Sequence, residues 1–400
     1  VIGCGGRSAC YLRQLQEGMG RDWKITALAD PGERALATFQ EQYAGGDART
    51  FSSGPDLLEA LRGKLDAVVI GSPNADHLES VLPALDQGLA IVLEKPVATT
   101  EEDCRTMWEA YAKAGRPPLF VGFVLRYTNF YRRVKELIDD GTLGQILTIE
   151  ASEYMGPPLT AMYMRHWRRK HAAAGPILLE KCSHDMDLLN WFAGTRPERV
   201  SSFARRTRFV PRPDAATHCR ACSLKESCRF AQHNVAPYLM DKSAEYLRQV
   251  GPLIPKDNDL CVFNSDKDIV DHQVVNLEYE GGLLVSFTLT ADQPRTTRTI
   301  RVCGTEGQLR GDIGRDTLTL EAHPAQKEEA AREETFTVEH DGSGHHGGDS
   351  ILADAFKAQL RDRPEPPLAG MREGVNAAFV SLAAYRAAEQ GTVEPVDWIA

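Results

Sequence analysis

The sequence predicts an α/β protein with an N-terminal Rossmann domain, a doubly wound parallel sheet, followed by an α+β domain with a large, mostly antiparallel open sheet. Three observations support this prediction. A glycine-rich turn lies at the very start, and short apolar strands then alternate with helices up to about residue 123. Longer stretches of alternating apolar and polar residues follow. We therefore expect a dinucleotide-binding domain over 1–124 and a substrate-binding and oligomerisation domain over 125–400.

The composition narrows the class of protein. A chain of 400 residues that is 42% hydrophobic and 26% charged is typical of a globular protein of two domains. The net charge of −10 and the lack of a basic stripe argue against a nucleic-acid partner. No apolar run is long enough for a membrane span. Nine scattered cysteines favour a reducing, cytoplasmic location. Because Val1 falls within an expected strand, we expect further residues upstream, where a signal peptide would go unseen.

The first turn is typical of a nucleotide-binding site. It follows the pattern G-x-G-x-x-G, except that Ser8 stands in place of the third glycine. The turn consists of Gly3, Cys4, Gly5, Gly6, Arg7 and Ser8. Gly3 permits the tight turn, and Gly5 lets the backbone approach a pyrophosphate at a helix N-terminus. Ser8 is small enough to pack close to the strand.

An acidic residue ends the second expected strand, over 23–29. Asp30 lies about 20 residues beyond the glycine turn, where a carboxylate binds the ribose hydroxyls of NAD and repels the 2′-phosphate of NADP. NAD is therefore favoured over NADP. Asp30 could equally serve as the N-cap of a helix that starts at Pro31.

The strand–helix alternation continues through the first domain. We expect strands at 67–70, 90–93 and 119–123, a helix at 75–87, and a helix opened by a capping box of Thr100 and Asp103. Ligands of doubly wound sheets bind beyond the carboxyl ends of the strands. The polar residues expected at that edge, and hence near the cofactor, are Ser72, Pro73, Asn74, His77, Glu94 and Lys95.

The second half predicts a helix and a sheet. Residues 126–140 have a helical pattern, and alternation predicts strands at 145–154, 200–209, 271–279, 283–289, 297–303 and 317–321. The open face of this sheet, if apolar, would be covered by another subunit of a dimer or tetramer. We expect 325–334 to be a solvated loop or short exposed helix, and 350–360 to be an amphipathic helix.

The stretch 175–191 combines apolar residues with an unusual density of charge. Burying charges is costly unless they are paired or used, so this density indicates function. On a helix, Glu180 and His184 share one face, and Asp187 lies near enough to orient the histidine ring. A histidine beside a carboxylate suits proton transfer near neutral pH. The alternative is a capped helix with a solvated charged face.

Two further segments contain potential ligand contacts. The basic run 165–171 includes Trp167 and Arg168, which could hold cofactor phosphates or an anionic substrate, or form a solvated loop. The glycine-rich turn 342–349 includes His346, a candidate substrate contact, although capping by Asp349 would also explain the turn.

A cysteine-rich insertion is expected at 215–235. Cys219, Cys222 and Cys228 lie within ten residues of one another, with His218 and His233 nearby. This spacing favours a structural zinc site about as much as reduced structural thiols, because three ligands leave a tetrahedral site open. Cys182, Cys261 or a histidine would have to complete it.

The whole chain resembles the Gfo/Idh/MocA oxidoreductase family, named for glucose–fructose oxidoreductase and inositol dehydrogenase. The resemblance rests on 3–7, 72–74 with His77, 94–96, 122–127, 175–187, 304–307 and 346–349. The stretch 94–96 after a strand and the spacing of Gly175, Glu180 and His184 are its most specific parts. The sequence departs from the family pattern at Glu180, usually aspartate, at Cys182, usually glycine, and at the cysteine insertion. These departures concern the substrate rather than the reaction type.

The resemblance implies a Rossmann domain, an open sheet that forms the oligomer interface, and hydride transfer between a nicotinamide and a sugar or cyclitol carbinol. It assigns Lys95, Glu180 and His184 as catalytic residues and Asp187 as the second aspartate. We expect Arg126, Tyr154 and His346 to contact the substrate too.

In the expected reaction His184 accepts the hydroxyl proton, held by Asp187 or Glu180, while Lys95 stabilises the alkoxide. Two alternatives stay open. One is an NAD-dependent glycoside hydrolase that works by transient oxidation, elimination, water addition and re-reduction. The other, less favoured because Lys95 and His184 are both present, is a non-catalytic NAD-dependent regulator.

Overall fold

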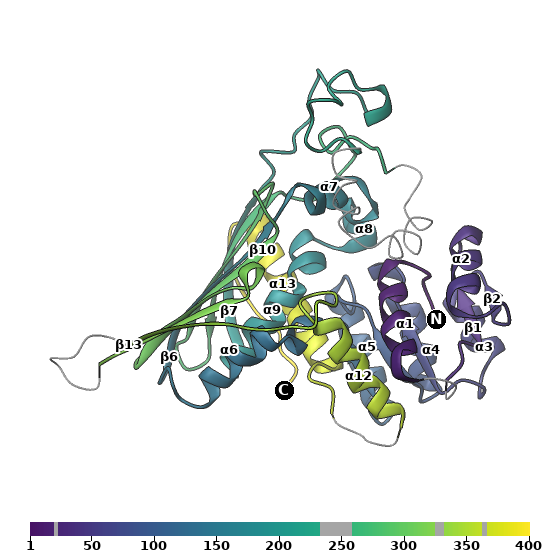
Figure 1. Ribbon diagram of the computed structural model, residues 1–400, viewed down its shortest axis with the longest axis horizontal. Coiled ribbons are helices and arrows are strands. Elements are labelled where there is room, and N and C mark those ends of the chain that lie inside the picture. Colours follow the sequence, from purple (N-terminus) through teal and green to yellow (C-terminus); the bar gives the residue numbers. More distant parts are fainter. Residues whose placement is uncertain (20–22, 233–257, 325–331, 362–365) are drawn as a thin grey trace.

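The computed structural model describes residues 1–19, 23–232, 258–324, 332–361 and 366–400. An N-terminal α/β domain lies beside a large twisted sheet, and helices fill the space between them (Figure 1). This is the predicted architecture of a parallel Rossmann sheet followed by a mostly antiparallel sheet. No helix of the described residues is long and apolar enough to cross a membrane.

The N-terminal domain contains short parallel strands that are largely buried. Ile2 bridges Ala29 on one side and Ile70 on the other, and so joins two groups of strands into one parallel sheet in which its segment is central. The strands are β1 (Ala27–Ala29), β2 (Arg49–Phe51), β3 (Ala67–Ile70), β4 (Ala90–Leu93) and β5 (Leu119–Val121). The helices are α1 (Gly6–Met19), α2 (Glu33–Tyr43), α3 (Gly54–Ala60), α4 (His77–Asp86) and α5 (Glu101–Lys113).

Local side-chain chemistry sets several helix ends. The hydroxyl of Thr100 accepts the amide of Asp103 at 3.1 Å and opens α5. Thr128 does the same for α6 (Asn129–Asp139), at 3.2 Å from the amide of Tyr131. Gly194 ends α9 (Ile177–Ala193) in the left-handed conformation that glycine favours.

The second domain is built on a sheet in which nine described strands follow the order β13-β12-β11-β10-β6-β9-β8-β7-β14. All neighbours are antiparallel except β6 and β9. The strands are β6 (Ile146–Met155), β7 (Pro197–Arg205), β8 (His272–Tyr279), β9 (Leu284–Ala291), β10 (Thr297–Gly304), β11 (Gly307–Asp312), β12 (Thr317–Ala322), β13 (Arg332–Thr337) and β14 (Val393–Pro395). The remaining helices are α7 (Pro157–Arg165), α8 (His171–Ala174), α12 (Gly348–Leu360) and α13 (Met371–Gln390).

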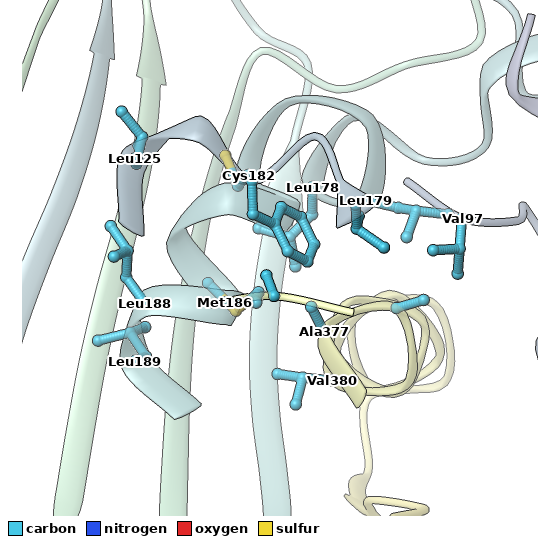
Figure 2. Close-up of a cluster of buried hydrophobic side chains, with 14 of the residues drawn as sticks. Val97, Leu125, Leu178, Leu179, Cys182, Met186, Leu188, Leu189, Ala377 and Val380 are labelled. Carbon is cyan, nitrogen blue, oxygen red and sulfur yellow. The ribbon is translucent and has the colours of Figure 1, made fainter. Parts of the chain in front are cut away.

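Helix α9 lies at the centre of the hydrophobic core. Its apolar side chains pack against α13 and against Val97, which follows β4 of the first domain (Figure 2). Because α9 touches both domains, its polar residues are held in a fixed place between them. This is the segment in which the sequence showed its unusual density of charge.

Helix α12 belongs in space to the N-terminal domain, although it comes late in the chain. It contacts α1 (Figure 1), and its Leu352 and Phe356 share a core with Tyr11 and Phe120. The ring centroids of Phe120 and Phe356 are 5.4 Å apart. The turn that precedes α12 is thereby brought to the edge of the nucleotide-binding sheet.

Some expected elements differ in extent. The strand expected at 23–29 is confined to β1, because its partner β2 offers only three residues for pairing. The helix expected at 126–140 is interrupted at Thr128, whose extended backbone separates a short 3-10 turn (Val124–Tyr127) from α6.

Two other segments were predicted wrongly. The strand expected at 200–209 ends at Arg205, after which the amides of Arg208 and Phe209 donate to the carboxylate of Asp271 at 2.8 and 2.9 Å instead of to a strand. Residues 332–334, expected in a loop or helix, begin β13 because they pair with β12. The rest of that segment, 325–331, lies outside the described residues.

Candidate active site

The glycine turn packs tightly on one side and is open on the other. Gly3 has a φ of +82°, and a Cβ there would lie 2.4 Å from the amide nitrogen of Ser72, so no other residue fits. At Gly5 and Gly6 a Cβ would meet no atom within 4 Å. Ser8 is fully buried and packs against Gly71. The N-terminus of α1 therefore faces free space that a phosphate group can enter.

Asp30 lies beside this turn. One carboxylate oxygen accepts the amide of Cys4 and the other accepts the amide of Gly32, each at 2.8 Å. The N-cap position of α2 belongs to Gly32, so the alternative role of Asp30 as that cap is not what the structure shows. The carboxylate is at the end of β1, within the turn that would receive a dinucleotide.

Other residues expected near the cofactor hold loops together. The ring of His77 is buried, with Nε2 at 3.1 Å from the carbonyl oxygen of Ser72 and Nδ1 at 3.0 Å from that of Pro96. The side-chain amide of Asn74 donates to the carbonyl of Ala174 at 2.9 Å, which connects the first domain to the end of α8, just before α9. These side chains position the loops after β3 and β4. Pro73 lies in the loop after β3, just before a 3-10 turn (Asn74–Asp76).

Arg7 joins three distant segments. Its guanidinium forms ion pairs of 2.9 Å with Glu94, which follows β4, and of 2.9 Å with Asp349 on α12. The hydroxyl of Tyr11 donates to Glu94 at 2.7 Å. Burial alone would raise the pKa of Glu94, but Arg7 and Lys95 lower it. Arg7 and Glu94 thus form a charged ion pair at the edge of the sheet where the cofactor is expected.

Lys95, Glu180, Tyr163 and Arg168 form a buried polar cluster between the domains. The ammonium of Lys95 donates to the backbone carbonyl of Glu180 and lies 3.9 Å from its carboxylate. Arg168 donates to that carboxylate at 2.6 Å, and the hydroxyl of Tyr163 donates to its other oxygen. Burial alone would raise the pKa of Glu180, yet the two cations and these hydrogen bonds lower it to about 2. Glu180 is therefore an anion that holds Lys95 in place.

His184 lies one turn further along α9. Its side chain is buried, with 6% of the residue exposed, and its ring centroid is 5.8 Å from that of Phe123 and 6.0 Å from that of His345. Nδ1 has no hydrogen-bonding partner among the described residues. Burial lowers the pKa of His184 well below its usual value, and the charge of Lys95 lowers it further. The ring is accordingly neutral and able to accept a proton near pH 7.

The expectation that Asp187 orients His184 is wrong. Arg126 takes both oxygens of Asp187, at 2.7 and 2.8 Å, and also donates to the carbonyl of Leu368 at 2.8 Å. The guanidinium of Arg126 is thus occupied by protein groups and does not point to a substrate. Glu180 does not hold His184 either, since its carboxylate faces Lys95 and Arg168.

Of three more expected ligand contacts, Tyr154 and His346 are located elsewhere, whereas Trp167 lies beside Arg168 of the polar cluster. Tyr154 lies on β6 in register with Thr290 and Thr297, on the sheet face opposite to Glu153, which pairs with Lys181 of α9 at 2.9 Å. Strand alternation therefore points Tyr154 away from His184. Trp167 stacks under the guanidinium of Arg168 at 4.4 Å. His346 contacts Asp316, and it is the neighbouring His345 that faces His184.

The structure does not assemble the zinc site that the cysteine spacing favoured. Among the described residues, no group of three ligand atoms within 4.8 Å of one another includes Cys219, Cys222 or Cys228, and no disulfide joins them. The buried guanidinium of Arg165 interacts electrostatically with Cys219, Cys228 and Cys261, and a cation there opposes a metal ion. His233 lies outside the described residues.

Two further parts of the site, Tyr163 and His345, were expected from the sequence only as alternative proton acceptors to His184. Tyr163 comes from α7, and its bond to Glu180 depends on packing that has no local signature. His345, with a φ of +51°, has its Nδ1 at 3.0 Å from the carboxylate of Asp349 and its ring near His184. The doubled histidine in 345–346 was the only signal for it.

Comparison with known proteins settles the family. Residues 1–123 match the family model described as "Oxidoreductase family, NAD-binding Rossmann fold", and residues 135–397 match "Oxidoreductase family, C-terminal alpha/beta domain". The chain belongs to the Gfo/Idh/MocA oxidoreductase family. It is therefore a member of an NAD-binding oxidoreductase family with inositol dehydrogenases among its relatives.

The matched proteins cover different shares of this chain. An oxidoreductase named YteT from Bacillus subtilis is 25% identical over 96% of this chain and 95% of its own length. Inositol 2-dehydrogenase 3 from Saccharopolyspora erythraea is 33% identical over 48% of this chain and 52% of its own length. A levoglucosan dehydrogenase in complex with NADH shares the fold with a TM-score of 0.74 and 18% identity, covering 100% of this chain and 98% of that one.

Proposed function

We propose that this protein is an NAD-dependent dehydrogenase that transfers hydride between a nicotinamide and a carbinol of a sugar, sugar derivative or cyclitol. One observation carries the proposal. Lys95, from the carboxyl end of β4, lies against Glu180 and acts electrostatically on His184, both from α9. A cation and a neutral histidine thus meet beside the nucleotide-binding edge of the first domain.

The residues at this edge fit NAD. The open turn at Gly5 and Gly6 can take the pyrophosphate at the N-terminus of α1, and Asp30 can take the ribose hydroxyls. The loops fixed by Asn74 and His77, and Trp167 with Arg168, would border the nicotinamide half. When bound, NAD accepts or supplies the hydride.

The protein's own residues then handle the proton and the charge. His184, neutral because it is buried, accepts the hydroxyl proton as hydride leaves the carbinol carbon. Lys95 stabilises the oxygen on which negative charge develops. Glu180, tied to Tyr163 and Arg168, keeps the Lys95 ammonium directed at that oxygen. In the reverse direction His184 returns the proton to the alkoxide.

The substrate class is supported by the relatives, which include inositol 2-dehydrogenases and a levoglucosan dehydrogenase. The test is a panel of sugars, inositols and glycosides incubated with NAD⁺, followed for NADH absorbance and for released aglycone. Stoichiometric NADH with one or more polyols supports the proposal. Aglycone release without net NADH would instead identify the glycoside hydrolase, and NAD binding without turnover across the panel would identify a regulator.

Cofactor choice gives a prediction about Asp30. The wild type should bind NADH more tightly than NADPH, because the carboxylate repels a 2′-phosphate. Asp30→Ser should reduce the difference between the affinities for NADH and NADPH, as measured by fluorescence titration with both nucleotides. Glu33→Ser, which removes a neighbouring carboxylate at the start of α2, is the matched control. A wild type that prefers NADPH, or a difference in affinity unchanged by Asp30→Ser, would contradict the role given to Asp30.

We also propose that a second copy of the chain covers the open face of the sheet. Three large apolar side chains lie exposed there on β7, β8 and β9: Phe203 at 67%, Val274 at 40% and Leu284 at 52%. Light scattering should give the mass of a dimer or tetramer, and Phe203→Glu together with Leu284→Glu should reduce it. A wild-type monomer would rule this interface out.

A further inference from the structure

A second cluster of metal-binding residue types lies outside the proposed hydride-transfer site. Asp316 ends a 3-10 turn (Ile313–Arg315), His340 follows β13, and His346 precedes α12. These three residues come from three different segments and offer ligand atoms that all lie within 4.8 Å of one another. Two imidazoles and one carboxylate are a known set of ligands for a divalent transition metal.

Two distances in the cluster, each to a different oxygen of Asp316, are close to the spacing of neighbouring ligands around a tetrahedral ion. Nδ1 of His346 lies 3.1 Å from one oxygen of Asp316, and Nε2 of His340 lies 3.4 Å from the other. A zinc ion bonded at about 2.0–2.1 Å to such atoms keeps neighbouring ligands about 3.3 Å apart. The side chains are about one-third exposed, at 30% for Asp316, 27% for His340 and 34% for His346, so an ion and a water ligand can reach them.

The backbone conformation of the turn that precedes α12 sets the position of His346. His345 and His346 both have left-handed backbones, with φ of +51° and +52°, which histidine adopts rarely. The chain accepts this conformation and thereby directs His346 to Asp316.

One hydrogen bond must be exchanged. The amide of Gly342 donates to Nδ1 of His340 at 3.0 Å, so in a neutral ring the proton is on Nε2. Coordination through Nε2 moves that proton to Nδ1, and the amide of Gly342 turns to another acceptor. A single backbone hydrogen bond contributes little beside a metal–imidazole bond. Gly342 has a φ of +77° and open space around its α-carbon, so this segment can adjust.

We propose that Asp316, His340 and His346 bind one divalent transition-metal ion, with zinc as the best match to the ligand set. The ion would tie the sheet edge at β12 and β13 to the turn that precedes α12. That turn carries His345, whose ring faces His184, and leads into the first turn of α12, where Asp349 pairs with Arg7. The metal would act by fixing this turn, and its binding does not depend on the proposed dehydrogenase activity.

Zinc binding to the full chain tests the proposal. Bound metal is first removed with EDTA, and the EDTA is then removed by dialysis. The protein should bind about one Zn²⁺ per chain in equilibrium dialysis, and its melting temperature should rise with zinc concentration. Cys222→Ser, which changes the cysteine-rich insertion, should bind zinc as the wild type does. The double variant His340→Ala/His346→Ala should lose the bound zinc and the zinc-dependent rise in melting temperature. No binding to the wild type would overturn the proposal.

Two controls keep the result interpretable. If the double variant does not fold, judged by circular dichroism, Asp316→Asn replaces it, and this variant should bind zinc at least tenfold more weakly. Cobalt substitution of the wild type should give visible ligand-field bands without thiolate charge-transfer bands. Thiolate bands, or zinc that survives His340→Ala/His346→Ala and is lost in Cys222→Ser, would assign the metal to the cysteines and overturn the proposal.

Discussion

Replacing Lys95 with methionine is expected to lower kcat by roughly 100-fold or more, because the variant loses the cation that stabilises the developing alkoxide. The side chains are similar in length, so packing changes little. Glu180 keeps Arg168 and Tyr163 as partners, and no unpaired buried anion results. The variant should therefore fold and still bind NADH. Steady-state kinetics on the best substrate of the panel, with NADH titration, provides the measurement.

Lys181→Met is the matched control for this loss of charge. Lys181 is adjacent to Glu180 on α9 but pairs with Glu153 at 2.9 Å, on the side that faces the sheet. Glu153 retains Arg298 at 2.7 Å, so we expect reduced stability with kcat within a few-fold of wild type. If Lys181→Met lowered kcat as much as Lys95→Met, the loss of kcat would come from removing any positive charge near α9 and not from a specific role of Lys95.

The sequence was sufficient for the parts of this protein whose signals are local. The turn from Gly3 to Ser8, the acid at Asp30 and the strand ends near Ser72 and Lys95 follow from short patterns and from the rule that ligands bind beyond strand carboxyl ends. Helix α9 was likewise recognisable, because charged residues within an apolar helix require partners. Its i, i+4 spacing correctly grouped Glu180 with His184 on one side of the helix.

The predictions that were wrong concern contacts between segments that are distant in the sequence. Asp187 is three residues from His184, yet its partner is Arg126, which packs beside α9 only in the folded protein. Tyr154 follows the alternation of β6, but alternation alone does not say which face meets the helices. Helix α12 joins the core of the first domain from more than 200 residues away in sequence, as its contact with α1 demonstrates. No spacing rule links these pairs.

His184→Ala should lower kcat by at least roughly 100-fold, because the variant loses the side chain that accepts the hydroxyl proton. Affinity for NADH should change little, since the proposed role of His184 is toward the substrate and not toward the nucleotide. The pH dependence provides a second readout. Burial and Lys95 lower the pKa of His184 below 6.5, so the basic form persists at neutral pH. In the wild type kcat/KM should be level near pH 7 and fall only as the pH drops through that lowered pKa.

In His184→Ala this acidic fall should disappear, leaving a low activity that changes little between about pH 5 and 7. His272→Ala is the control, since His272 is an exposed histidine on β8 that contacts Asp271 at 2.7 Å. It should retain both kcat and the wild-type pH profile. Near-normal turnover in His184→Ala, or loss of NADH binding in parallel with activity, would make α9 a structural helix. The search for a proton acceptor would then turn to His345, which Asp349 holds beside His184, to His346 or to Tyr163.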